Sequence, residues 1–148
     1  ESLMAIRDLH RRFGHIQEVI VQNFCPKEGT PMARAAGVST EEMCLTLRLA
    51  RDILPEEVAV QIPPNLADAA ALIPCGVDDL GGISPVTPDY INPEHPWPAV
   101  EELRRVAGEA ELRERLCIYP RFIERGWYPP AIEGLIRRLE QQIKGGKR

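Results

Sequence analysis

The stretch HIQEVIVQNF, residues 15–24, indicates the kind of fold that this chain forms. Its three consecutive β-branched residues, Val19 to Val21, make a short apolar run that would be covered on both faces, as in a strand of a parallel sheet. The run stops abruptly at two amides, Gln22 and Asn23. The stretch therefore predicts a buried parallel strand that ends in polar side chains.

Helical and strand patterns alternate along the rest of the chain. Ser39 and Glu42 form a capping box at the start of one helix, and Gly14 and Pro55 each end a helix. Helical patterns cover residues 1–13, 39–54, 66–73, 99–110 and 131–143, and strand patterns cover residues 19–21, 58–62, 76–83 and 116–119. One helix followed by four strand–helix units predicts an α/β fold with parallel strands and helices outside the sheet.

Two α/β architectures fit this order of elements. Four strand–helix units are half of a (βα)8 barrel, and the first helix has no strand before it, so we expect a single partial domain over residues 1–148 that is a piece of a longer protein. An open, doubly wound sheet is the alternative. No glycine-rich fingerprint follows any predicted strand, which argues against the open sheet.

Composition excludes several functional classes. The net charge is −4 and Lys and Arg are scattered among acids, which argues against nucleic-acid binding. No apolar run approaches the roughly 20 residues of a membrane span, and no signal segment stands at the start. The four cysteines form no CxxC pair, so we expect no metal ligand among them. We expect Cys44 and Cys117 to be small buried side chains, and hence a reducing, cytoplasmic location.

Polar side chains follow the predicted strands where each one ends. Because the carboxyl ends of parallel strands meet at one edge of a sheet, these side chains are expected to share a rim where ligands bind. Amides there suit a neutral hydrogen-bonding ligand, such as a uracil or a ribityl group. The candidate catalytic residues are Asp78 and Asp79, and the candidate ligand-binding residues are Gln22, Asn23, Gln61, Pro63, Asn65, Gly81, Gly82 and Ser84.

Neighbouring residues of a strand point to opposite faces, so only one of Asp78 and Asp79 can point inward. The sequence leaves open which one does. The histidines are weak candidates, since His10 and His15 are expected to be exposed at the edge of the first helix and His95 lies in a proline-rich loop. The prolines between Pro85 and Pro98 predict a stiff loop over the mouth of the site.

Three segments, HIQEVIVQNF, VQIPPNL and GVDDLGGISPVTPDYINPEHPWP, closely resemble the C-terminal half of the FO synthases, specifically the subunit or domain that closes the deazaflavin ring. The resemblance runs over nearly the whole chain, and the long segment from Gly76 to Pro98 is its most specific part. Related aminofutalosine enzymes of menaquinone biosynthesis share the glycine turn but not the SPVTPDYINP continuation, and they remain an alternative.

The resemblance implies a radical S-adenosylmethionine barrel with a [4Fe-4S] cluster, in which this chain would begin at the fourth helix and supply strands five to eight. The cluster motif CxxxCxxC would lie in the N-terminal half, and none of the four cysteines here matches it. The implied reaction is hydrogen abstraction from an adduct of 5-amino-6-ribitylamino-uracil and a tyrosine-derived 4-hydroxybenzyl group, followed by ring closure with loss of ammonia.

A half-barrel alone would lack the cluster site and expose two strand edges. We therefore expect the isolated piece to be inactive, and to pair with the N-terminal half of the barrel, with a partner FO synthase subunit or with a second copy of itself. A non-catalytic half-barrel that serves in interaction or assembly is the alternative from a different functional class.

Overall fold

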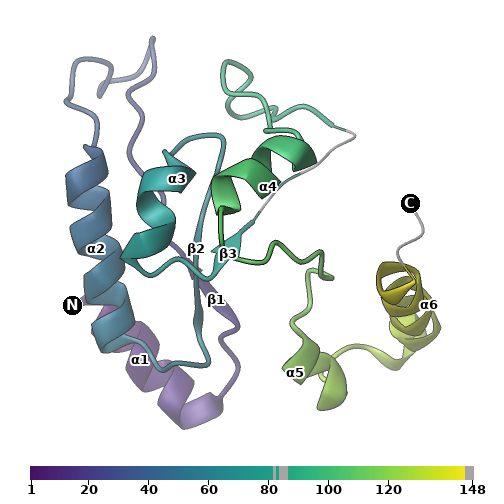
Figure 1. Cartoon of the computed structure of the whole chain (residues 1–148). Coiled ribbons are helices and arrows are strands. Elements are labelled where there is room, and N and C mark those ends of the chain that lie inside the picture. The colour runs from purple at the N-terminus through teal and green to yellow at the C-terminus, as the bar shows by residue number, and fades with distance from the viewer. Residues whose placement is uncertain (82, 84–86, 146–148) are drawn as a thin grey trace. The chain divides into compact units, whose positions relative to one another are not determined.

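The computed structural model describes residues 1–81, 83 and 87–145, and it forms two compact units, Glu1–Glu111 and Leu112–Arg148. The first unit contains three parallel strands, β1 (Glu18–Ile20), β2 (Ala59–Ile62) and β3 (Asp79–Leu80), in the order β1-β2-β3 (Figure 1). The prediction of parallel strands in the first three strand–helix units is confirmed, although β1 begins one residue earlier than its sequence pattern and β2 and β3 are shorter than theirs. The expectation that residues 1–148 form a single partial domain stays a prediction.

Four helices of the first unit accompany the strands (Figure 1): α1 (Ser2–Phe13), α2 (Thr40–Ile53), α3 (Ala69–Leu72) and α4 (Val100–Ala107), and a 3-10 turn, η1 (Ile73–Cys75), follows α3. α1 contacts α2, α2 contacts α3 and α3 contacts α4. Helices that follow one another in the chain are therefore neighbours in space, as the strands are. The capping box of α2 is confirmed, because the side chains of Ser39 and Glu42 each accept a hydrogen bond from the other's backbone N–H. Gly14 ends α1 in the left-handed conformation.

The core lies on one face of the sheet. Val58, Val60 and Ile62 are fully buried there and belong to the same apolar cluster as Leu47 of α2 and Leu72 of α3. The opposite face is different, since Ile20 on it is 57% exposed. The prediction that the first strand is covered on both faces is therefore wrong for Ile20, because only the helix-facing side of β1 has core residues against it.

His10 is buried, at 4% exposure, although the sequence suggested an exposed ring. Its Nδ1 accepts a hydrogen bond from the Ile16 N–H at 3.2 Å, and its Nε2 lies 3.3 Å from Glu57 Oε1. These partners satisfy both ring nitrogens and make burial tolerable. Two large apolar side chains of the same helix, Leu9 and Phe13, are about half exposed, at 49% and 52%.

The cysteines also differ from expectation. Cys44 of α2 and Cys75 of η1 form a disulfide, and Cys117 is exposed. Neither Cys44 nor Cys117 is thus a small buried thiol, because helix and strand periodicity does not reveal which residues from distant segments meet. The expectation of a reducing compartment rested on unpaired cysteines, and that argument loses its basis.

The second unit contains α5 (Pro120–Glu124), a 3-10 turn, η2 (Pro130–Ile132), and α6 (Glu133–Lys144). Phe122 and Ile136 are buried among its described residues, and the Phe122 ring lies against that of Trp127, with 5.4 Å between centroids. The predicted strand at residues 116–119 is wrong. The Leu116 carbonyl accepts a hydrogen bond from the Arg115 side chain, at 2.7 Å from Nη1. In a strand, this carbonyl would accept from the backbone N–H of a neighbouring strand.

No helix among the described residues is long and apolar enough to cross a membrane.

Leu47 provides a test of the core. Leu47→Ala should lower the free energy of unfolding by about 2–5 kcal/mol, because the side chain is fully buried and its loss leaves a cavity. Leu45→Ala, on the same helix, is the matched control, since Leu45 is 66% exposed and the change should stay within about 0.5 kcal/mol. Urea denaturation of the two variants measures both effects, and equal destabilisation would contradict this core assignment.

Candidate active site

The face of the sheet opposite the core carries a row of three side chains, one from each strand. Ile20 pairs with Gln61, and Gln61 pairs with Asp79, in a parallel register. Paired residues of parallel strands point to the same face, so Ile20, Gln61 and Asp79 lie side by side. Of the two candidate acids, Asp79 is therefore the one on this face.

Asp78 points to the helix-facing side. Its Oδ2 accepts a hydrogen bond from the Val60 N–H at 2.8 Å and lies 3.0 Å from Nη1 of Arg51. Arg51, in the last turn of α2, also donates to the Val58 carbonyl. Asp78 lies just before β3 begins rather than at the strand's carboxyl end, and these contacts tie β2, β3 and α2 together.

Gln61 occupies the space that the missing side chain of Gly81 leaves. A Cβ on Gly81 would lie 1.0 Å from Gln61 Nε2 and 2.1 Å from its Cδ, so the glycine is needed for the amide to lie there. Gln61 is only 4% exposed, and its Oε1 has no hydrogen-bond partner within the described part of the chain. A buried acceptor without a partner costs free energy that a bound ligand could offset.

Two further amides lie beyond the ends of β1 and β2. Nδ2 of Asn23 donates to the Leu66 carbonyl at 2.8 Å, and Nδ2 of Asn65 donates to Asp89 Oδ2 at 2.9 Å and to the His95 carbonyl at 3.0 Å. Oδ1 of each amide is buried without a partner among the residues that the structure describes. The exits of two adjacent strands thus present buried oxygens, as Gln61 does.

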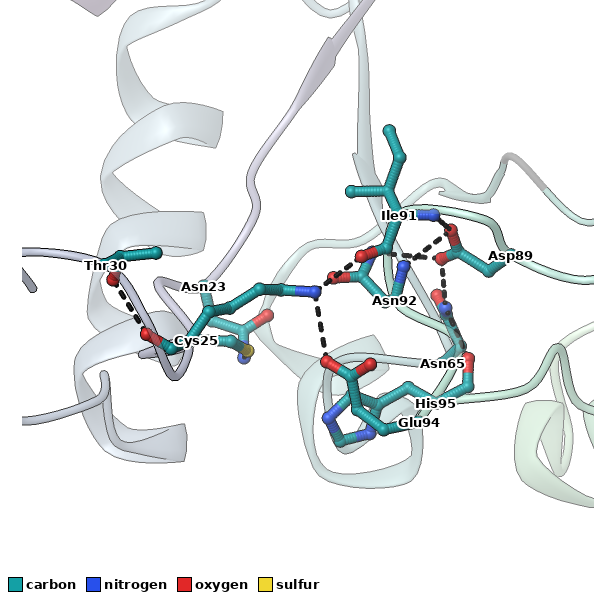
Figure 2. Close-up of polar contacts among 10 residues, drawn as sticks. Asn23, Cys25, Thr30, Asn65, Asp89, Ile91, Asn92, Glu94 and His95 are labelled. Atoms are coloured by element: carbon teal, nitrogen blue, oxygen red, sulfur yellow. Dashed lines mark hydrogen bonds and ion pairs between the residues drawn. The ribbon is translucent and has the colours of Figure 1, made fainter. Parts of the chain in front are cut away.

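The loop that follows β3 is fastened to the segments that follow β1 and β2. Figure 2 shows Asp89 bonded to Asn65 and Asn92. Nζ of Lys27, from the segment after β1, donates to the Ile91 carbonyl at 2.5 Å and to Glu94 Oε1 at 3.0 Å. Three successive strand exits are therefore joined through polar side chains at one edge of the sheet.

Asp89 is the centre of this network. Its Oδ1 accepts from the backbone N–H groups of Ile91 and Asn92, and its Oδ2 accepts from Nδ2 of Asn92 and Nδ2 of Asn65. The side-chain bond from Asn92, followed by the backbone bonds and the bond from Asn65, lowers the pKa of Asp89 to about 2. The ionised carboxylate thereby orders the loop.

The other predicted residues take simpler positions. Gln22 is exposed just beyond β1, and Pro63 is partly buried in a turn that its carbonyl closes with the Leu66 N–H at 3.2 Å. Gly82 and Ser84 lie outside the described residues.

Sequence reasoning missed Lys27, Asp89 and Asn92. The stretch DYIN, residues 89–92, carried a usable signal, because an Asp that opens a turn accepts bonds from backbone N–H groups two and three residues later.

Gly81→Ala should displace the Gln61 amide and lower the free energy of unfolding by about 1–3 kcal/mol, because the new Cβ overlaps the amide in a buried place. Gly134→Ala in α6 is the control, since nothing lies within 4 Å of its added Cβ. This helical change should be neutral or stabilising by up to about 1 kcal/mol. Thermal unfolding measures both, and a neutral Gly81→Ala would contradict the close approach.

The loop should loosen in acid. A carboxylate with a lowered pKa stabilises the folded form above its unfolded pKa of about 3.8, and this contribution is lost as the pH falls towards the folded value of about 2. Amide hydrogen exchange at Ile91 and Asn92, corrected for its intrinsic pH dependence, should therefore be slow above about pH 5 and accelerate between about pH 4 and 2. Asp89→Asn should abolish this dependence, and an Asp89 carboxyl titrating at its ordinary value would contradict it.

Comparison with known proteins gives a consistent result. No family model matches the chain, and no solved structure matches it. Among curated proteins, 7,8-didemethyl-8-hydroxy-5-deazariboflavin synthases match it over nearly its whole length. The protein from Methanosphaerula palustris is 68% identical over 144 residues, 97% of this chain and 44% of that protein. The protein from Methanoculleus marisnigri is 68% identical over 143 residues, 97% of this chain and 43% of that protein.

A more distant relative carries the same name. The protein from Archaeoglobus fulgidus is 55% identical over 139 residues, which is 93% of this chain and 43% of that protein. The chain thus spans less than half the length of these relatives. The resemblance found in the sequence motifs is confirmed: over nearly its whole length, the chain is a homologue of the 7,8-didemethyl-8-hydroxy-5-deazariboflavin (FO) synthases.

Proposed function

We propose that this chain is the C-terminal half of a radical S-adenosylmethionine (βα)8 barrel in an FO synthase. The face of its sheet opposite the core, here called the open face, would line the lumen in which the deazaflavin ring closes. Identity of 68% to proteins of that name supports the family. The row of Ile20, Gln61 and Asp79 carries the assignment of the face, because it sets beside a carboxylate an amide whose buried oxygen has no partner among the described residues. The three-stranded parallel sheet with its helices on one face is compatible with a barrel wall.

The proposed substrate is the adduct of 5-amino-6-ribitylamino-uracil with a tyrosine-derived 4-hydroxybenzyl group, and the reaction is a lyase step that closes the ring with loss of ammonia. The uracil and the ribityl chain both carry N–H or O–H donors. Oε1 of Gln61 and Oδ1 of Asn23 and Asn65 would accept from these donors. Acceptance at fixed positions orients the substrate for ring closure.

Asp79 is the proposed catalytic acid or base. It lies beside Gln61 on the open face, where a carboxylate could orient a substrate hydroxyl or take the proton released as the ring closes. Asp78 lies on the helix-facing side, where it contacts Arg51 and the Val60 N–H, so the catalytic role that the sequence allowed to both acids is now proposed for Asp79 alone.

The cofactors divide between this chain and the rest of the protein. The buried amide oxygens fit hydrogen-bond donors of S-adenosylmethionine as well as those of the substrate. The chain holds no CxxxCxxC motif, so we place the [4Fe-4S] ligands in the N-terminal half. When bound, S-adenosylmethionine and the cluster would supply the carbon radical that abstracts hydrogen, and the barrel wall would keep water from it.

The N-terminal half, or a partner FO synthase subunit, is the proposed partner of this chain in the cytoplasm. β1 pairs with one strand in the described sheet, so its other edge could accept a further strand. The helix that precedes β1 in the chain, α1, carries exposed apolar side chains that could pack on elements supplied by the partner. These are Met4, Leu9 and Phe13. The isolated piece is expected to lack turnover.

A non-catalytic assembly module remains the second candidate, and the same exposed apolar residues on α1 favour it. Substitutions distinguish the two functions, because an assembly module would need Leu9 and Phe13 for binding its partner but would tolerate the loss of Asp79.

Paired substitutions test the proposed function in the full-length protein. Asp79→Ala should lower the rate of deazaflavin formation, followed by absorbance, about 100-fold or more while leaving the fold intact. Asp78→Ala is the matched control from the opposite face. It should cost about 1–3 kcal/mol of stability through the lost bonds to Val60 and Arg51, and should retain turnover below its unfolding temperature. Full turnover in Asp79→Ala would refute the assignment.

A further inference from the structure

The orientation of two rim amides is dictated by the groups that they contact. Nδ2 of Asn65 meets Asp89 Oδ2 and the His95 carbonyl, and both of these oxygens can only accept. The amide must therefore turn its NH2 group towards them and its Oδ1 away. Asn23 is held in the same sense, since its Nδ2 meets the Leu66 carbonyl.

The side-chain oxygens of these two amides and of Gln61 can only accept hydrogen bonds. Oδ1 of Asn23, Oδ1 of Asn65 and Oε1 of Gln61 are buried, and none has a partner among residues 1–81, 83 and 87–145. Asn23 contacts the carbonyl of the residue after Asn65, so the first two amides are neighbours. Gln61 belongs to β2, the strand that leads to Asn65.

The nearby charges do not favour an anion. Asp89 is ionised and adjacent to Asn65. The Lys27 ammonium is held by Glu94 Oε1 and the Ile91 carbonyl. A ligand that presents hydroxyl or amino donors matches these acceptors, whereas a carboxylate or phosphate would place oxygen against oxygen.

We propose that Asp89 is a positioning residue that fixes the hydrogen-bonding polarity of this site, so that the site takes a neutral or cationic ligand through O–H and N–H donors and rejects anionic groups. The inference rests on the proposed function and deepens it, because it states how a ribityl or amino group is recognised. Asp89 acts through Asn65 and does not touch the ligand itself.

A single isosteric change should reverse the polarity. In Asp89→Asn, the amide oxygen would keep the bonds from the Ile91 and Asn92 N–H groups, and the new NH2 would replace Oδ2. The new NH2 would then face the NH2 groups of both Asn65 and Asn92. A half-turn of the Asn65 side chain would send its oxygen to residue 89 and its NH2 into the site, at the cost of its hydrogen bond to the His95 carbonyl.

The first measurement concerns the amide itself, in the full-length protein labelled with ¹⁵N-asparagine. In the wild type, the two Asn65 side-chain protons should exchange slowly with water, as expected for donors bound to Asp89 and His95. In Asp89→Asn at least one should exchange about tenfold faster. Glu94→Gln is the matched control, because it removes the Lys27 ion pair from the same loop without touching Asn65. Equal exchange in wild type and Asp89→Asn would overturn the positioning role.

The second measurement uses two probes, ribitol and ribonate, which differ in a terminal hydroxymethyl and a carboxylate group. Wild type and Glu94→Gln should bind ribitol at least about fivefold more tightly than ribonate, the effect of roughly one hydrogen bond. Asp89→Asn should lose or reverse this preference. Equal binding of both probes by the wild type, or an unchanged preference in Asp89→Asn, would overturn the proposal.

Turnover separates this inference from the proposed function. If the full-length protein forms deazaflavin, Asp89→Asn should raise the KM for the ribitylamino substrate about fivefold with kcat changed less than twofold. A lowered kcat at unchanged KM would contradict the positioning role while leaving the reaction established. Absence of turnover in the wild type would refute the proposed function, and the exchange and probe measurements would still decide the role of Asp89.

Discussion

The alternation of side chains along β2 is the constraint on which the rest of this chain depends. Val58, Val60 and Ile62 are fully buried against the helices, and a shift of one residue would send all three to the other face. Their burial therefore fixes the side on which Gln61 lies. The neighbouring strands follow in register, and Ile20 and Asp79 join Gln61 on the open face. Packing on one side thus determines the chemistry on the other.

Asp78 and Asp79 illustrate how this constraint divides two adjacent acids. Asp78 anchors β3 to β2 through the Val60 N–H and to α2 through Arg51. This anchor sets the register in which Asp79 meets Gln61. The acid that anchors β3 and the acid on the opposite face of the sheet are consecutive residues, so the position of one follows from the contacts of the other.

The sequence predicted those features that depend on local pattern. It identified three parallel strands, the capping box at Ser39 and the glycine end of α1, because periodicity and capping act within a few residues. It also placed Asn23, Gln61 and Asn65 near strand ends. It could not orient the acid pair, since the choice depends on an arginine about 27 residues earlier in the chain. His10, the Cys44–Cys75 pair and the absent strand at 116–119 likewise depend on contacts between distant segments.

The disulfide between Cys44 and Cys75 has a mechanical consequence. It closes a loop of 31 residues that contains the end of α2, all of β2 and all of α3. A stretching force applied at the two ends of the chain would pass from residue 44 to residue 75 through the sulfur atoms and bypass the central strand. About 100 Å of contour length would stay hidden from the pull. The strand that carries Gln61 would be shielded from the load, and neighbouring segments would be extended first.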